Sequence, residues 1–213
     1  MFSKKNKILF IIHDVYQEDN HFPLGPAYLA AILHSQGAQV ESYCMDVFHY
    51  TNEQLAEHLQ ENEYDLICLG FLAARFKETV LSLCQAINAH KKNAWFILGG
   101  QGPSPIPEYI LRTTGADLVA VGEAENTIVD LLACKINKGN LSQVKGIAYL
   151  AEDIFYETGR NKLIIKLDEI PLPHWEIFPM KEYTTCIKFP NQQPGENHLE
   201  FITSRGCVNH CNF

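Results

Sequence analysis

The sequence predicts an α/β domain built on a five-stranded parallel sheet with helices on both faces. Through residues 1–140, stretches of strand character alternate with stretches of helical periodicity, and the joints between them are short. The first strand stretch, Lys7 to His13, contains an uninterrupted apolar run from Ile8 to Ile12, which is typical of a central strand covered on both sides. With 213 residues, 46% of them hydrophobic, the chain can bury a core of this size.

The remaining elements follow in order. A polar loop precedes a helix that is expected to begin at Pro26 and to end at Gly37. Polar and apolar residues alternate in the second strand, Gln39–Cys44, which indicates a half-exposed strand at the sheet edge. Three further strands, each followed by a helix, are expected at 65–70, 95–98 and 117–121. The predicted order is therefore 2-1-3-4-5, which is Rossmann-like and, more specifically, flavodoxin-like.

After about residue 140 the pattern changes. Residues 146–150 and 154–157 flank a two-residue joint and predict a β-hairpin, with 163–165 as a further short strand, so that 141–167 form a small β appendage. Five prolines punctuate the stretch from Pro171 to Pro194, and we expect a linker at 168–197 that forms no packed element of its own. A last strand at 198–203 opens the segment 198–213.

Composition excludes several classes of function. The 17 Lys and Arg residues stand against 25 Asp and Glu residues, so the net charge of -8 offers no basic footprint for nucleic acid. The apolar run at 8–12 is too short for a membrane span or a signal peptide. Most of the seven cysteines fall in apolar stretches, which indicates buried thiols in a reducing, cytoplasmic compartment.

Glycine-rich joints mark the expected ligand site. In an open parallel sheet, ligands bind beyond the carboxyl ends of the strands, where this chain places 14–25, 70–73, 99–102 and 122–125. Backbone without a Cβ lets a large ligand approach closely, and glycines follow three successive strands. The first joint lacks Gly-x-Gly-x-x-Gly, and the chain has no Walker motif, which argues against NAD, FAD and ATP.

The pair Cys207 and Cys211 is the sharpest local feature. Two thiolates four residues apart after a strand suit iron or zinc. The residues alone leave open a flavodoxin-like, non-enzymatic module for a flavin or a phosphate, and a zinc-binding interaction protein that adds His198 or His210 to the two cysteines.

Four motifs in order resemble a known family. The segment 204–213, Ser-Arg-Gly-Cys-Val-Asn-His-Cys-Asn-Phe, resembles the start of the Cys-x3-Cys-x2-Cys motif of radical S-adenosylmethionine (SAM) enzymes, and the chain ends before the third cysteine. Residues 22–33, 97–103 and 120–127 resemble the cobalamin-binding domain that precedes this core in cobalamin-dependent radical SAM enzymes, and 167–173 is similar to the interdomain linker.

The resemblance implies a cobalamin-binding domain at 1–140 and the start of a radical SAM domain at 198–213. Cys207 and Cys211 would hold a [4Fe-4S] cluster that binds SAM, and cleavage of SAM would give a 5′-deoxyadenosyl radical for methyl transfer or a related rearrangement. A full-length enzyme of this kind would act on a small molecule or a peptide and would need an electron donor protein, whereas the 213 residues alone are expected to be inactive and to hold no stable cluster. The residues implied to contact cobalamin are Leu24, Gly25, Phe71, Leu72, Ala73, Arg75, Gly99, Gly100, Gln101, Gly102, Pro103, Gly122, Glu123 and Glu125.

One departure concerns the cobalt ligand. Cobalamin domains with a lower axial histidine carry Asp-x-His-x-x-Gly, whereas His21 precedes Gly25 by one residue too many. We therefore expect His21 to be a solvated loop residue, with the lower face of cobalt free of protein histidine. On this view Gly100→Leu weakens cobalamin binding far more than His21→Ala.

Overall fold

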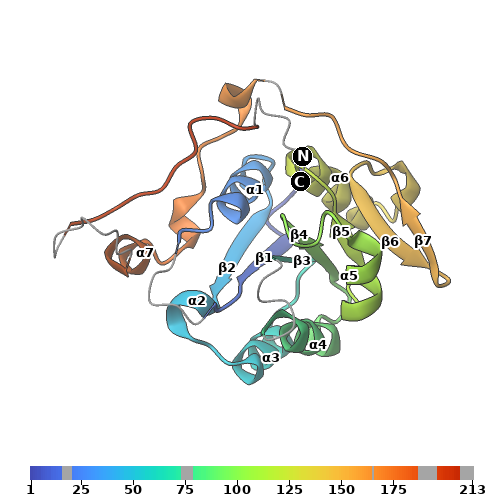
Figure 1. Cartoon of the computed structure of the whole chain (residues 1–213), viewed down its shortest axis with the longest axis horizontal. Coiled ribbons are helices and arrows are strands. Elements are labelled where there is room, and N and C mark those ends of the chain that lie inside the picture. The colour runs from blue at the N-terminus through green and yellow to red at the C-terminus, as the bar shows by residue number, and fades with distance from the viewer. Residues whose placement is uncertain (16–20, 73–78, 165, 187–195, 207–213) are drawn as a thin grey trace, which may run out of the picture.

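The computed structural model describes residues 1–15, 21–72, 79–164, 166–186 and 196–206 (Figure 1). Strands and helices alternate along the first two-thirds of the chain, as the sequence predicts. The elements are β1 (Lys7–Ile12), α1 (Leu24–Ser35), β2 (Gln39–Cys44), α2 (Met45–Phe48), α3 (Asn52–Glu61), β3 (Leu66–Gly70), α4 (Leu81–His90), β4 (Trp95–Gly99), α5 (Pro107–Thr114), β5 (Leu118–Ala120), α6 (Glu125–Ile136), β6 (Ile147–Ala151), β7 (Ile154–Glu157) and α7 (Met180–Cys186). Short 3-10 helices lie at Leu141–Gln143, Leu167–Glu169 and Trp175–Ile177.

The strand order is β2-β1-β3-β4-β5-β6-β7 in one sheet. The first five strands are parallel, which confirms the predicted order 2-1-3-4-5 and the edge position of β2. The predicted hairpin also forms, but it does not stand apart from the domain. Strand β6 pairs antiparallel with β5 between Val119 and Ala148, so the hairpin extends the main sheet.

Side-chain alternation along the strands builds two cores, one on each face of the sheet. Leu9, Ile67 and Phe96 point toward α3, α4 and α5 and belong to one buried cluster. Ile8 and Leu66, one residue away in register, belong to the opposite cluster with α1 and α6. Figure 1 shows α1 and α6 together on one side of the sheet and α3 and α4 on the other. No helix in the described residues is long and apolar enough to cross a membrane.

Local capping explains where α3 begins. The Thr51 hydroxyl accepts a hydrogen bond from the backbone N–H of Gln54 at 3.3 Å, and the Gln54 side chain accepts one from the Thr51 N–H at 2.9 Å. This reciprocal pair satisfies two backbone donors that the first turn of a helix otherwise leaves unpaired. The Thr51 and Gln54 pattern in the sequence predicts this helix start, and the structure confirms it.

Three expectations for the later part of the chain are wrong. The stretch after residue 168 forms α7, and Phe178 and Tyr183 pack with Phe22, Ala27 and Cys44 in a third buried cluster. The backbone N–H of His174 also donates to Ala27 in α1 at 3.0 Å. Prolines set the ends of these short elements without preventing them from packing. Residues 198–203 form no strand, and neither do 163 and 164, because they pair with no neighbouring strand.

A buried hydrogen bond attaches α7 to the domain. The Tyr183 hydroxyl, in a residue that is 1% exposed, donates to the Asp46 carboxylate at 2.8 and 3.0 Å from its two oxygens. Burial raises the pKa of Asp46 to about 6, although the hydrogen bond from Tyr183 acts in the opposite direction. The ionised form of Asp46 is therefore unfavourable in the folded protein, and the contribution of Asp46 to the free energy of unfolding depends on pH.

We predict that the titration of Asp46 lowers the free energy of unfolding as the pH rises from 4 to 7, against opposite contributions from His13 and His58, whose pKa values burial lowers. Because the folded-state pKa of Asp46 is raised, the folded state binds this proton more tightly than the unfolded state. The contribution is fully present below about pH 4 and is lost as the pH passes 6, by roughly 3 kcal/mol. Asp46→Asn keeps an acceptor for Tyr183 and should remove this part of the pH dependence in urea unfolding.

The matched control is Asp168→Asn, at an exposed aspartate, which should retain the pH dependence of the parent protein. Equal losses of stability between pH 4 and 7 in the parent protein and in Asp46→Asn would show that another group titrates.

Candidate cofactor-binding site

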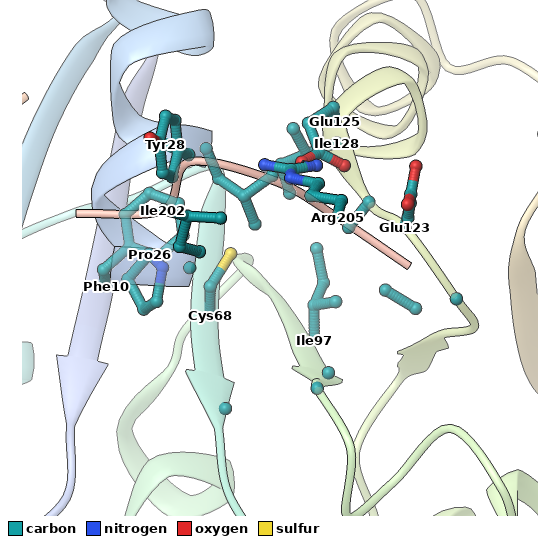
Figure 2. Close-up of a pocket in the computed structure, with 18 of the residues that line it drawn as sticks. Phe10, Pro26, Tyr28, Cys68, Ile97, Glu123, Glu125, Ile128, Ile202 and Arg205 are labelled. Carbon is teal, nitrogen blue, oxygen red and sulfur yellow. The ribbon is translucent and has the colours of Figure 1, made fainter. Parts of the chain in front are cut away.

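A cavity of about 450 Å³ lies at the carboxyl ends of the central strands, between the sheet and helices α1 and α6. Phe10, Cys68, Ile97 and Ala120 come to it from β1, β3, β4 and β5. Figure 2 shows Tyr28 and Pro26 of α1 on one side and Ile128 of α6 on the other. This is the crevice at which open parallel sheets bind ligands.

Small residues at the strand ends leave this space open. Successive side chains alternate between sheet faces, so the position of Gly99 lies on the same face as Ile97. A Cβ built on Gly99 lies 3.6 Å from the Cβ of Ala120, which is ordinary contact, and among the described residues other than its chain neighbours no further atom lies within 4 Å of it. A longer side chain there would extend into the cavity that Ile97 and Ala120 line.

The turns beyond the strands depend on glycine at two positions. Gly100 and Gly122 have φ angles of +93° and +84°, in the left-handed region that side chains strain. The Ser104 hydroxyl holds the second turn, since it donates to the Ala120 carbonyl at 3.2 Å and accepts from the Gly122 N–H at 3.3 Å. Both glycines line the cavity, and their backbone is open to a ligand.

Residues 196–206, which we call the covering segment, lie over the cavity. Ile202, Ser204 and Arg205 line it from above, and Figure 2 shows the segment passing between Tyr28 and Glu123. The Arg205 guanidinium forms an ion pair with Glu125, whose side chain is only 7% exposed, and lies 5.4 Å from the centre of the Tyr28 ring. Arg205 thus links α1 and α6, the two helices that flank the cavity.

Six of the residues implied to contact cobalamin line the cavity: Gly25, Gly99, Gly100, Gly122, Glu123 and Glu125. Six others lie outside its walls. Leu24 packs against the cluster of Phe22 and Phe178, Phe71 is in the core beneath α4, and Leu72 is 64% exposed. Gln101 is exposed and Pro103 is buried. Ala73 and Arg75 lie outside the described residues. Contact with cobalamin stays a prediction for the whole set.

Gly102 has a packing role. Its N–H donates to the Phe71 carbonyl at 3.0 Å, and a Cβ there would lie 2.6 Å from the same oxygen. Glycine is needed because the two loops approach this closely.

The glycine-rich joints in the sequence did not identify the strand residues that form the cavity wall. Phe10, Cys68, Ile97 and Ala120 share one sheet face near the strand ends, and the period-2 alternation of the strands carries this information. Arg205 lies directly before Gly206 and Cys207, but its contact with Glu125 spans 80 positions in the sequence, and no local pattern predicts it.

Two other predicted sites have different outcomes. The His21 side chain is 69% exposed, as expected for a solvated loop residue, and its Nδ1 also lies 2.8 Å from a carboxylate oxygen of Glu200 in the covering segment. Cys207 and Cys211 lie outside the described residues, and their role as metal ligands stays a prediction. Within the described residues, no cluster of three or more His, Cys, Asp or Glu side chains could hold a metal ion.

The chemistry of the cavity suits binding. Burial raises the pKa of the Cys68 thiol to about 12, so the thiol is neutral, and Glu125 is paired with Arg205. The fold and the site together define an α/β domain with a ligand-sized cavity at the carboxyl edge of its sheet.

The chain belongs to the B12-binding domain family, whose model matches residues 14–132. Over 90% of its length it is 26% identical to cytidylyl-2-hydroxyethylphosphonate methyltransferase of Streptomyces wedmorensis, and 25% identical to an uncharacterized methyltransferase of Pyrococcus horikoshii. The aligned parts cover 43% and 40% of those proteins, so the chain spans about two-fifths of their length.

Solved structures show the same fold. The cobalamin-dependent SAM radical enzyme OxsB, with aqua-cobalamin and SAM bound, matches 81% of this chain and 24% of its own with a TM-score of 0.71 at 23% identity. The radical SAM methyltransferase TsrM from Kitasatospora setae matches 72% of this chain and 30% of its own with a TM-score of 0.63 at 15% identity.

We predict that Arg205→Gln lowers the free energy of unfolding by about 1–3 kcal/mol, because Glu125 is left buried without its charged partner. The double variant Glu125→Gln/Arg205→Gln should lose less than the sum of the two single variants in urea unfolding.

Arg160→Gln, at an exposed arginine beyond β7, serves as the control and should change stability by less than about 0.5 kcal/mol. Strictly additive losses in the double variant would mean that Arg205 and Glu125 do not stabilise each other.

Proposed function

We propose that this cobalamin-binding domain takes the nucleotide arm of cobalamin into the cavity and carries the corrin ring at the glycine turns above it. The cavity is the observation that carries the proposal. Its 450 Å³ is within the range of small-ligand sites but is far too small for a corrin ring with its side chains. One arm of the cofactor therefore enters the cavity, while the ring stays at the carboxyl ends of the strands.

The residues present fit such a cofactor. Gly100 and Gly122 expose backbone where the ring would lie, and a side chain at Gly99 would occupy the space that the arm needs. Bound cobalamin would supply a cobalt centre that can carry a methyl group. The chain's own residues would bind the arm and exclude water from it.

We further propose that the domain belongs to a radical SAM enzyme that transfers a methyl group or carries out a related radical rearrangement. The relatives named as methyltransferases and the pair Cys207 and Cys211 support this assignment. Such an enzyme would use a [4Fe-4S] cluster and SAM, would receive electrons from a donor protein and would act on a small molecule or a peptide. The buried free thiols of Cys44, Cys68, Cys84 and Cys134 fit a reducing, cytoplasmic compartment.

The family match favours cobalamin over the flavin or phosphate ligand of a flavodoxin-like module. A zinc-binding interaction protein would depend on Cys207 and Cys211. Absorption spectra distinguish the three, because corrin and flavin absorb differently in the visible range and zinc does not absorb there.

Titration with hydroxocobalamin tests the site. We predict that Gly99→Val weakens binding at least about tenfold, because the added side chain fills space needed by the cofactor. Gly99 is a better position for this test than Gly100, whose φ of +93° would strain any side chain. Thermal melting should show that the variant is folded.

Two controls accompany this measurement. Ala151→Val adds the same kind of side chain at an exposed position of β6 and should leave the affinity unchanged. His21→Ala should leave both the affinity and the cobalt spectrum unchanged. Binding by Gly99→Val at parent strength would place the cofactor elsewhere, and a changed cobalt spectrum in His21→Ala would identify a histidine ligand.

The cluster proposal has its own test. We predict that anaerobic reconstitution of the 213-residue chain with iron and sulfide gives less than one [4Fe-4S] cluster per chain, because the chain contains only two cysteines of the three-cysteine motif. Stoichiometric cluster that is lost in Cys207→Ala and in Cys211→Ala would contradict this.

A further inference from the structure

The strands and the facing sides of α1 and α6 give the cavity walls that are mainly apolar. The strands contribute Phe10, Cys68, Ile97 and Ala120, and the helices contribute Leu29 and Ile128. Figure 2 shows Cys68 and Ile97 pointing up from the strands into the space below the covering segment. Cys68 is the polar exception among these six, and its neutral thiol is a weak hydrogen-bond donor.

The stronger polar groups lie toward the mouth. Glu123 lies in the turn before α6, Glu125 is the first residue of α6, and Arg205 comes from the covering segment. Tyr28 of α1 and Ser204 of the covering segment add hydroxyl groups to the lining. Glu125 and Arg205 already satisfy each other by forming an ion pair. The inner part of the cavity therefore offers contact with carbon and little hydrogen bonding.

We propose that this cavity selects among corrinoids by the chemistry of their lower base, accepting a methylated benzimidazole and disfavouring a purine such as adenine. The inference rests on the cobalamin-binding function proposed above. The two kinds of base are both flat bicyclic rings of similar size, so their shapes differ little. They differ in polarity, because adenine carries an amino group and additional ring nitrogens.

Desolvation provides the discrimination. A polar group that leaves water for an apolar cavity without a new hydrogen-bond partner binds less favourably, whereas the methyl groups of dimethylbenzimidazole gain from burial. An apolar wall formed by Ile97, Ala120 and Ile128 stabilises dimethylbenzimidazole and not adenine. We expect a preference of about ten- to a hundredfold in the dissociation constant.

Three corrinoids test this with the parent chain. Cobalamin contains dimethylbenzimidazole, adeninylcobamide contains adenine in its place, and cobinamide lacks the nucleotide altogether. Spectroscopic titration should give the tightest binding for cobalamin, with adeninylcobamide and cobinamide each at least about tenfold weaker.

The outcomes separate this inference from the function on which it rests. If none of the three binds, the proposed cobalamin site fails. If all three bind equally, the domain binds corrinoids but the cavity does not hold the base. Equal binding of cobalamin and adeninylcobamide, with cobinamide weaker, shows that the base is held without selection. Either of the last two results overturns the inference and leaves the cobalamin function intact.

A matched pair at Ile97 tests the physical cause. Valine and threonine have nearly the same shape and both suit a strand, but threonine adds a hydroxyl group to the wall. Ile97→Val should retain the preference for cobalamin over adeninylcobamide, whereas Ile97→Thr should reduce it several-fold. An equal change of the ratio in both variants would assign the preference to shape instead of polarity. Thermal melting and cobalamin binding by Ile97→Val verify that the strand is intact.

Discussion

The cavity exists because the central strands end in residues too small to fill the space beneath α1 and α6. The sheet is buried on both faces, so each strand residue points into one of two cores. On the face of α1 and α6, Gly70, Gly99 and Ala120 occupy the last positions of β3, β4 and β5. Larger residues deeper in the same face, such as Ile8 and Leu66, hold the helices against the sheet. Packing is therefore tight at the base of this layer and open at its carboxyl edge.

The chain after the hairpin returns across the domain and covers this opening. Its path is fixed by contacts at separate points: the bond from His174 to Ala27, the burial of Tyr183 against Asp46, and the ion pair of Arg205 with Glu125. Arg205 and Gly206 line the cavity, and Cys207 is the next residue in the sequence. In a radical SAM enzyme of the proposed kind, this path would connect the cobalamin pocket directly to the loop that holds the iron-sulfur cluster.

In the proposed function, the cavity binds the cofactor arm, and the reaction takes place on the bound cofactor outside the cavity. The cavity contains a neutral thiol, mainly apolar walls and the ion pair of Arg205 with Glu125, which suit the retention of a cofactor arm. The reactive centre would be the cobalt of the bound cofactor, at the edge where Gly100 and Gly122 expose their backbone. The small strand ends serve this arrangement by giving the arm a dry and preformed site.

The sequence by itself determined the sheet order, because alternation of strands and helices with short joints leaves few arrangements for a parallel sheet. The order of its motifs also indicated the cobalamin family, and Gly99, Gly100 and Gly122 pointed to the sheet edge at which the cavity lies. Only the tertiary structure decided that the proline-rich stretch packs through Tyr183, that the hairpin joins β5, and that Arg205 covers the cavity. These outcomes depend on contacts such as Tyr183 with Asp46 and Arg205 with Glu125, which join residues 137 and 80 positions apart. Local propensity and periodicity describe neighbours along the chain, so they carry no information about which distant side chains meet.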